Sequence, residues 1–121
     1  MVYIDGFVLP VKKTKVKEYK ALSTKMGKLM EKFGVLKYVE CVGDDLNRKG
    51  VGMPFPKLAK AKKDEVVFFS FIVYQSKAHR KQVMAKLMKD PFMTDPKMTA
   101  KSMPFDMKRM ASGGFKAVVD F

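Results

Sequence analysis

The chain has 121 residues and a mass of 13.8 kDa, and its composition is 47% hydrophobic and 31% charged. These values predict one globular domain over residues 1–121 and argue against both a disordered chain and a two-lobed enzyme. Lysine and arginine exceed acidic residues by 25 to 12, which makes this a basic protein of net charge +13. No stretch approaches the roughly 18 apolar residues of a membrane span, and the first residues lack a secretory pattern. We therefore expect a cytoplasmic protein without a membrane partner.

The first third of the chain predicts a strand, a helix and a second strand. Val2–Leu9 is rich in β-branched and aromatic residues and runs into Pro10, where we expect the strand to end because proline cannot donate to a sheet ladder. Over Thr14–Phe33 apolar residues recur at steps of three and four between lysines, which predicts an amphipathic helix that stops at Gly34. Val35–Val42 predicts the second strand.

The rest of the chain predicts a strand, a helix and a strand after a long excursion over Gly43–Pro56. Val66–Tyr74 gives the strongest strand signal, since only Ser70 interrupts its valines, phenylalanines and isoleucine. Ser76 is expected to cap a helix that ends before Asp90 and the following proline. Phe115–Val119 predicts the closing strand.

This order of elements is that of the α+β, ferredoxin-like βαββαβ protomer, in which two helices cover one face of an antiparallel sheet. The third strand is apolar on both sides, because side chains of a strand alternate between its faces. One side carries Val67, Phe69, Phe71 and Val73, and the other carries Val66, Phe68, Ile72 and Tyr74. No predicted helix remains for the second face, and monomers rarely expose a patch of this size. We therefore expect a homodimer.

Several long strings resemble the YbaA-like bacterial family of unknown function, over essentially the whole chain. They are Tyr3–Val11, Tyr38–Asp45, Phe69–Tyr74, Ser76–Arg80, Met103–Met110 and Gly113–Phe115. The resemblance implies a ferredoxin-like protomer of the dimeric α/β-barrel superfamily, where two sheets meet face to face, and it implies no established activity. The chain departs from the family pattern in having no tryptophan and in its charge of +13.

The candidate catalytic and ligand-binding residues of the strands are two carboxylates and two tyrosines. Tyr3 and Asp5 share one face of the first strand, and Tyr38 and Glu40 share one face of the second. If these faces point into the space between two sheets, desolvation there would raise the pKa of a carboxylate, which is the environment that a general base needs. The alternative is structural: Asp5 and Glu40 pair with lysines or accept hydrogen bonds at the edge of the sheet.

Four further residue types bear on chemistry. His79, a weak catalytic candidate, and Arg80, a ligand-binding candidate, lie early in the second helix, a place suited to an anion; the alternative is a histidine that faces solvent or caps a neighbouring carbonyl. Because His79 is the only histidine, we expect no metal site. Gly113 and Gly114 lack the context of a phosphate loop and predict a bend or a bulge, so we expect no cofactor. Cys41, inside a predicted strand, is interpreted as a buried structural thiol.

The lysines gather in Lys12–Lys32 and Lys57–Lys63 and would attract polyanions. Nonspecific binding of RNA or DNA is therefore one alternative function, but few arginines and few exposed aromatic residues favour solvated faces instead. The function we favour is binding or transforming a small molecule in a cavity of the dimeric barrel. A purely structural interaction dimer is the third alternative.

Overall fold

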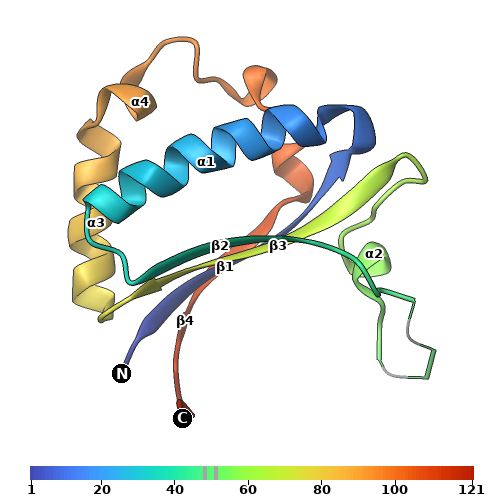
Figure 1. Ribbon diagram of the computed structural model, residues 1–121, viewed down its shortest axis with the longest axis horizontal. Helices are drawn as coiled ribbons and strands as arrows, with labels where there is room; N and C mark the ends of the chain where they lie inside the picture. Colours follow the sequence, from blue (N-terminus) through green and yellow to red (C-terminus); the bar gives the residue numbers. More distant parts are fainter. Residues whose placement is uncertain (48, 51) are drawn as a thin grey trace.

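The computed structural model, which describes residues 1–47, 49–50 and 52–121, is a four-stranded antiparallel sheet with two long helices on one face (Figure 1). The strands lie in the order β2-β3-β1-β4. The main elements are β1 (Tyr3–Lys12), α1 (Val16–Lys32), β2 (Lys37–Val42), β3 (Glu65–Tyr74), α3 (Lys77–Lys89) and β4 (Ala111–Lys116). This arrangement confirms the predicted α+β, ferredoxin-like fold.

Short helical pieces occupy the long connections. α2 (Phe55–Leu58) follows the predicted excursion, and α4 (Pro91–Thr94) follows α3. Arg48 and Val51 of the excursion lie outside the described residues. No described helix is long and apolar enough to cross a membrane.

Strand β1 does not end at Pro10, as the sequence predicted, but continues to Lys12. Its partner β4 reaches only to Ala111, which lies opposite Val8, so beyond Val8 one side of β1 pairs with no strand. On the other side Pro10 lies opposite Val67 of β3. A proline is tolerated where one edge of a strand needs no N–H donor, and the pairing with β3 extends β1 past it.

Strand β4 begins four residues before the predicted closing strand and ends at Lys116, which corrects that prediction. Gly113 and Gly114 are neither a bend nor a bulge: they lie within β4, opposite Gly6 and Asp5 of β1. A Cβ atom at Gly114 would overlap the outer end of the Tyr3 side chain, so glycine there leaves room for that ring. Pairing with β1, rather than local β-propensity, sets the ends of the strand.

The core lies between the sheet and the helices, on what we call the helix-covered face. Two buried clusters fill it: Met30, Ile72, Tyr74, Val83 and Leu87 form one, and Leu9, Val11, Tyr19 and Phe68 form the other. The other side of the sheet, which we call the open face, carries Ile4, Val8, Val39, Cys41, Phe69, Phe71, Val73, Ala111 and Phe115. In Figure 1 the two long helices, α1 and α3, lie on the opposite side of the sheet from this face, and of the described helices only the short helix α2 lies on its side. Cys41, predicted to be buried, is exposed on this face.

An ion pair ties the start of β3 to the segment before β4. The two terminal nitrogens of Arg109 donate to the two carboxylate oxygens of Glu65, each at 2.7 Å, and the Glu65 side chain is only 2% exposed. Arg109 also donates to the carbonyl oxygen of Lys60 and to Asp106, and the N–H of Lys62 donates to Glu65. The bidentate bond from Arg109 lowers the pKa of Glu65 from 4.5 to about 2.

We expect acid to weaken the fold through Glu65. Because its pKa in the folded chain lies below its unfolded value, its contribution is fully present above pH 4.5 and is lost as the pH falls towards about 2. A shift of this size corresponds to about 3 kcal/mol. The free energy of unfolding in urea, measured at a series of pH values, should fall across this window in the native chain and fall much less in Glu65→Gln.

The matched control is Asp64→Asn, which removes an exposed carboxylate that forms no ion pair among the described residues. This variant should keep the acid dependence of the native chain. An undiminished acid dependence in Glu65→Gln would contradict the prediction.

Candidate ligand-binding groove

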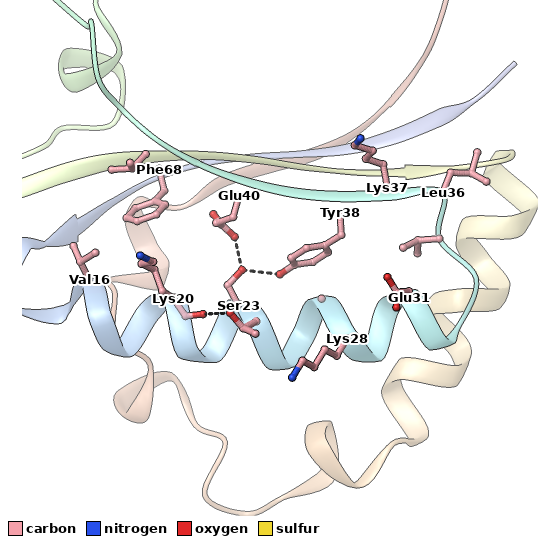
Figure 2. A pocket seen from close by; sticks show the side chains of 14 residues that line it. Val16, Lys20, Ser23, Lys28, Glu31, Leu36, Lys37, Tyr38, Glu40 and Phe68 are labelled. Atoms are coloured by element: carbon pink, nitrogen blue, oxygen red, sulfur yellow. Dashed lines mark hydrogen bonds between the residues drawn. The ribbon is translucent and has the colours of Figure 1, made fainter.

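A groove with a volume of about 640 Å³ lies between α1 and β2, at the edge of the sheet that β2 forms (Figure 2). Its walls are largely apolar, and lysines lie around them. The apolar lining residues are Val16, Val35, Leu36, Val42 and Phe68, and the lysines are Lys20, Lys28 and Lys37. Glu31 is also part of the lining.

The floor of the groove is a chain of hydroxyl groups that ends on Glu40. Tyr19 donates to Glu40 Oε1 at 2.7 Å, and Ser23 donates to Glu40 Oε2 at 2.6 Å. The Tyr38 hydroxyl lies 2.9 Å from Ser23 Oγ. Because Ser23 has one hydroxyl proton and directs it to Glu40, Tyr38 donates to Ser23. Figure 2 shows Ser23 between Glu40 and Tyr38.

The local sequence accounts for this arrangement. Tyr38 and Glu40 are two residues apart in β2, so both point to the helix-covered face, and Tyr19 and Ser23 lie one turn apart on α1. Gly27 lets the helix approach: a Cβ atom there would lie 3.0 Å from the Tyr38 ring. Sequence reasoning found Tyr38 and Glu40 but missed Tyr19 and Ser23, whose four-residue spacing on the apolar stripe was the available signal.

The electrostatics of the groove combine neutral hydroxyls, the two carboxylates Glu31 and Glu40, and three lysines. Burial raises the pKa of the Tyr38 hydroxyl, and burial together with the hydrogen bond to Glu40 raises that of Tyr19. Both tyrosines therefore stay protonated donors near neutral pH. Among the described residues Glu40 forms no ion pair. The groove thus offers an apolar surface with hydrogen-bonding groups at its base, and of its three lysines Lys20 directs its ammonium group towards the space between α1 and the sheet (Figure 2).

Asp5 belongs to a separate cluster on β1, β3 and α3. It is 5% exposed and accepts hydrogen bonds from the Tyr74 hydroxyl at 2.9 Å and from Arg80 Nε at 3.0 Å. The Arg80 guanidinium lies 6.0 Å from the centre of the Tyr3 ring. The structure therefore brings together Tyr3, Asp5 and Arg80. The carboxylates of Asp5 and Glu40 both lie on the helix-covered face, not on the open face where two sheets would meet.

His79 is held at the start of α3 by local hydrogen bonds. Its backbone N–H donates to the side chain of the helix cap Ser76, and its Nδ1 accepts from the N–H of Gln75 at 3.0 Å. The ring packs against Tyr74 with 6.1 Å between ring centres. In the described part of the chain, no three histidine, cysteine or acidic side chains are placed to hold a metal ion.

The fold and groove define a ferredoxin-like α+β protein with a pocket under the edge of its sheet. Residues 2–107 match a family described as a protein of unknown function, DUF1428. The uncharacterized protein YbaA of Escherichia coli K12 is 41% identical over 120 residues, which cover 99% of each chain. The chain therefore belongs to the DUF1428 family, which confirms the resemblance drawn from its sequence.

Solved structures share the fold at low sequence identity. An SnoaB variant, described as a cofactor-independent oxygenase from Streptomyces nogalater, is 11% identical, with a TM-score of 0.61 over 98% of this chain and 95% of that one. A protein from an uncultured marine organism, described as dimeric and ferredoxin-like, is 11% identical, with a TM-score of 0.56 over 100% of both chains. At these identities the likeness concerns the fold alone.

We expect Ser23→Ala to destabilise the fold by about 1–3 kcal/mol, because it leaves Glu40 and Tyr38 each short of a partner in a buried place. The control is Thr24→Ala on the next, exposed position of α1, whose hydroxyl bonds only the carbonyl oxygen of Lys20. It should change stability by less than about 0.5 kcal/mol. Urea unfolding of both variants is the measurement, and equal effects would contradict a structural role for the hydroxyl chain.

Proposed function

We propose that the protein is a homodimer that binds a small, largely apolar anion with a hydroxyl group in the groove between α1 and β2. The observation that carries the proposal is the pairing, in one groove, of the Glu40 hydroxyl chain with the ammonium group of Lys20 (Figure 2). A ligand hydroxyl would bond at the base, the anionic group would lie near Lys20, and the apolar body would contact the walls. Such pockets, apolar with a few convergent polar groups, are typical of small-molecule sites.

The structural neighbour SnoaB supports a small-molecule role for this fold, since it is described as a cofactor-independent oxygenase. The groove residues suit binding, and Glu40 is the group best placed to accept a proton from a bound hydroxyl, through Ser23 or directly. Asp5 suits this task less well, because the cation Arg80 is bonded to it, whereas the donors to Glu40 are neutral hydroxyls. We therefore place the ligand at Glu40, Tyr38 and Ser23, assign Tyr3, Asp5 and Arg80 to holding β1 and α3 together, and assign His79 to the start of α3.

The groove can be tested with an anionic apolar dye, 1-anilinonaphthalene-8-sulfonate, followed by fluorescence. We expect Lys20→Glu with Lys28→Glu to weaken its binding at least tenfold, because both lysines line the groove. The control is Lys17→Glu with Lys25→Glu, which makes the same change of charge with the same spacing on exposed positions of α1. Binding by the control should stay within about twofold of the native value.

Equal losses in the two double variants would contradict the groove. That result would show that dye affinity depends on the overall charge of the protein and not on the groove, as expected of a nonspecific polyanion-binding surface. Titrating the same two double variants with RNA at several salt concentrations tests the alternative function, nonspecific nucleic-acid binding, directly.

The dimer is supported by the open face and by the surface area of the protomer. Phe69 and Phe115 on that face are 44% and 63% exposed. The protomer exposes 8844 Å², about a third more than the roughly 6,600 Å² expected of a compact monomer of this mass. An excess of this size matches what an obligate interface buries. A second copy, placed with its own open face against this one, covers both at once.

Light scattering during gel filtration should give a mass about twice 13.8 kDa. We expect Phe115→Lys to shift the protein towards the monomer, because a lysine there would face an apolar interface. Met88→Lys is the control: Met88 is 58% exposed, a value close to that of Phe115, but it lies on α3 and away from the open face. A native chain that elutes as a monomer would contradict the dimer.

A further inference from the structure

The polar groups at the base of the groove form one continuous chain of hydrogen bonds from Tyr38 to Glu40. Tyr38 donates to Ser23 across 2.9 Å, and Ser23 donates to Glu40 Oε2 across 2.6 Å. Each hydroxyl carries one proton and can accept another, so the chain can run in either direction. With Glu40 ionised the chain runs towards the carboxylate. With Glu40 protonated it can reverse, and the Tyr38 hydroxyl is then free to donate to a ligand.

A chain that reverses in this way links a proton acceptor and a proton donor at two points of one groove. Burial raises the pKa of the Tyr38 hydroxyl, so this group keeps its proton near neutral pH. Glu40 forms no ion pair among the described residues, and both of its side-chain donors are neutral hydroxyls. A positioned base and acid are the two groups needed to move a proton from a carbon atom to a carbonyl oxygen.

The functional groups follow one another in a fixed order along the groove. Ser23 on α1 bonds to Glu40, and Gly27, one turn further along the helix, lies against the ring of Tyr38. Lys20 lies about one turn before Ser23. The order along the groove is therefore Lys20, Glu40 and Tyr38, as Figure 2 shows. A ligand that uses all three residues must carry an anion, a proton to be removed and a proton acceptor in this sequence.

We propose that the groove takes a β-keto carboxylate and interconverts its keto and enol forms, with Glu40 as the base and Tyr38 as the acid. This inference rests on the ligand site proposed above. In a β-keto acid the carboxylate, the methylene and the ketone follow one another in the order of Lys20, Glu40 and Tyr38. An apolar group beyond the ketone would contact the wall near Leu36 (Figure 2). The enol of such an acid is a largely apolar anion with a hydroxyl group, which is the ligand class proposed for the groove.

The reaction moves protons within the groove and needs no second reactant. A C–H bond of the methylene breaks, its proton goes to the carboxylate of Glu40, and its electron pair forms the C=C bond of the enol. The π electrons of the carbonyl group move to the ketone oxygen, which takes the proton of Tyr38. Tyr38 then takes the proton of Ser23, and Ser23 takes the proton held by Glu40. All three side chains return to their starting state, and ketonisation follows the same steps in reverse.

The test uses benzoylacetate, a β-keto acid with a phenyl group, as the probe. Exchange of its methylene protons in deuterium oxide, followed by NMR, reports the enolisation. We expect Glu40→Gln to lower the exchange rate of the native chain about a hundredfold, because the base is lost. Tyr38→Phe should lower it at least tenfold. The matched control is Glu18→Gln at an exposed position of α1, which should stay within about twofold of the native rate.

A second probe tests the order of the groups with the native chain alone. Phenylpyruvate is an α-keto acid, so its ketone lies next to the carboxylate and its methylene lies beyond the ketone. With its carboxylate at Lys20, the ketone would lie at Glu40 and the methylene towards Tyr38. Relative to the spontaneous rates, we expect the native chain to accelerate exchange at least tenfold less for phenylpyruvate than for benzoylacetate. Equal accelerations would overturn the assignment to β-keto acids.

Binding is measured separately, as the displacement of the anionic dye by benzoylacetate, and urea unfolding reports whether each variant is folded. If benzoylacetate displaces the dye but the native chain exchanges it no faster than Glu40→Gln does, enolisation is wrong and the ligand site stands. If benzoylacetate does not displace a dye that binds in the groove, the assignment to β-keto acids is wrong. If the lysine variants show that the dye binds outside the groove, the ligand site and the enolisation are both wrong.

Discussion

Strand β3 has apolar side chains on both of its faces, and the two long helices of the described chain, α1 and α3, cover only one of them (Figure 1). On the helix-covered face Phe68, Ile72 and Tyr74 are at most 7% exposed. On the open face Phe69 remains 44% exposed, although it contacts the rings of Phe55 and Phe71. An apolar sheet face costs free energy in water in proportion to its area. Which face the helices cover therefore decides where the buried polar clusters lie and which apolar side chains stay exposed.

Three carboxylates lie between the helices and the sheet or at its edge, and each is matched with donors. Glu40, Asp5 and Glu65 lie under α1, beside α3 and at the start of β3, and each accepts at least two side-chain hydrogen bonds. Within the described residues no buried side-chain nitrogen or oxygen lacks a hydrogen-bond partner. These clusters also join elements distant in sequence: Arg80 and Asp5 are 75 residues apart, and Arg109 and Glu65 are 44 apart. Because an unpaired buried polar group is costly, the clusters specify how the helices sit on the sheet.

The sequence predicted the order of the elements and α1 and β3 closely, because their patterns are local. The apolar stripe of Thr14–Phe33 corresponds to α1, and Gly34, with a φ of 91°, ends it as expected. The end of β1 and the position of β4 were wrong, because strand ends depend on which partner lies alongside. The prediction that Cys41 is buried was wrong for a related reason. Its side chain lies on the open face of β2, where a residue in a strand stays exposed. The site was found in part, since Tyr38 and Glu40 share a face, whereas their bonds to Tyr19 and Ser23 depend on how α1 lies over β2.

Asp5 and Glu40, the two carboxylates that the strand pattern pointed to, differ in their bonding partners. This difference explains why Glu40 lies at a candidate site and Asp5 does not. Asp5 is on β1, a central strand, and its charge is balanced by Arg80, whose pKa is raised in turn by the hydrogen bond to Asp5. Glu40 is on β2, the edge strand, and neutral hydroxyls bond to it. A carboxylate whose partner is a fixed cation has little free energy to gain from a ligand, whereas one held by hydroxyls retains its charge for a ligand that brings a donor. Position in the sheet, and not residue type, therefore separates a structural carboxylate from one available for binding.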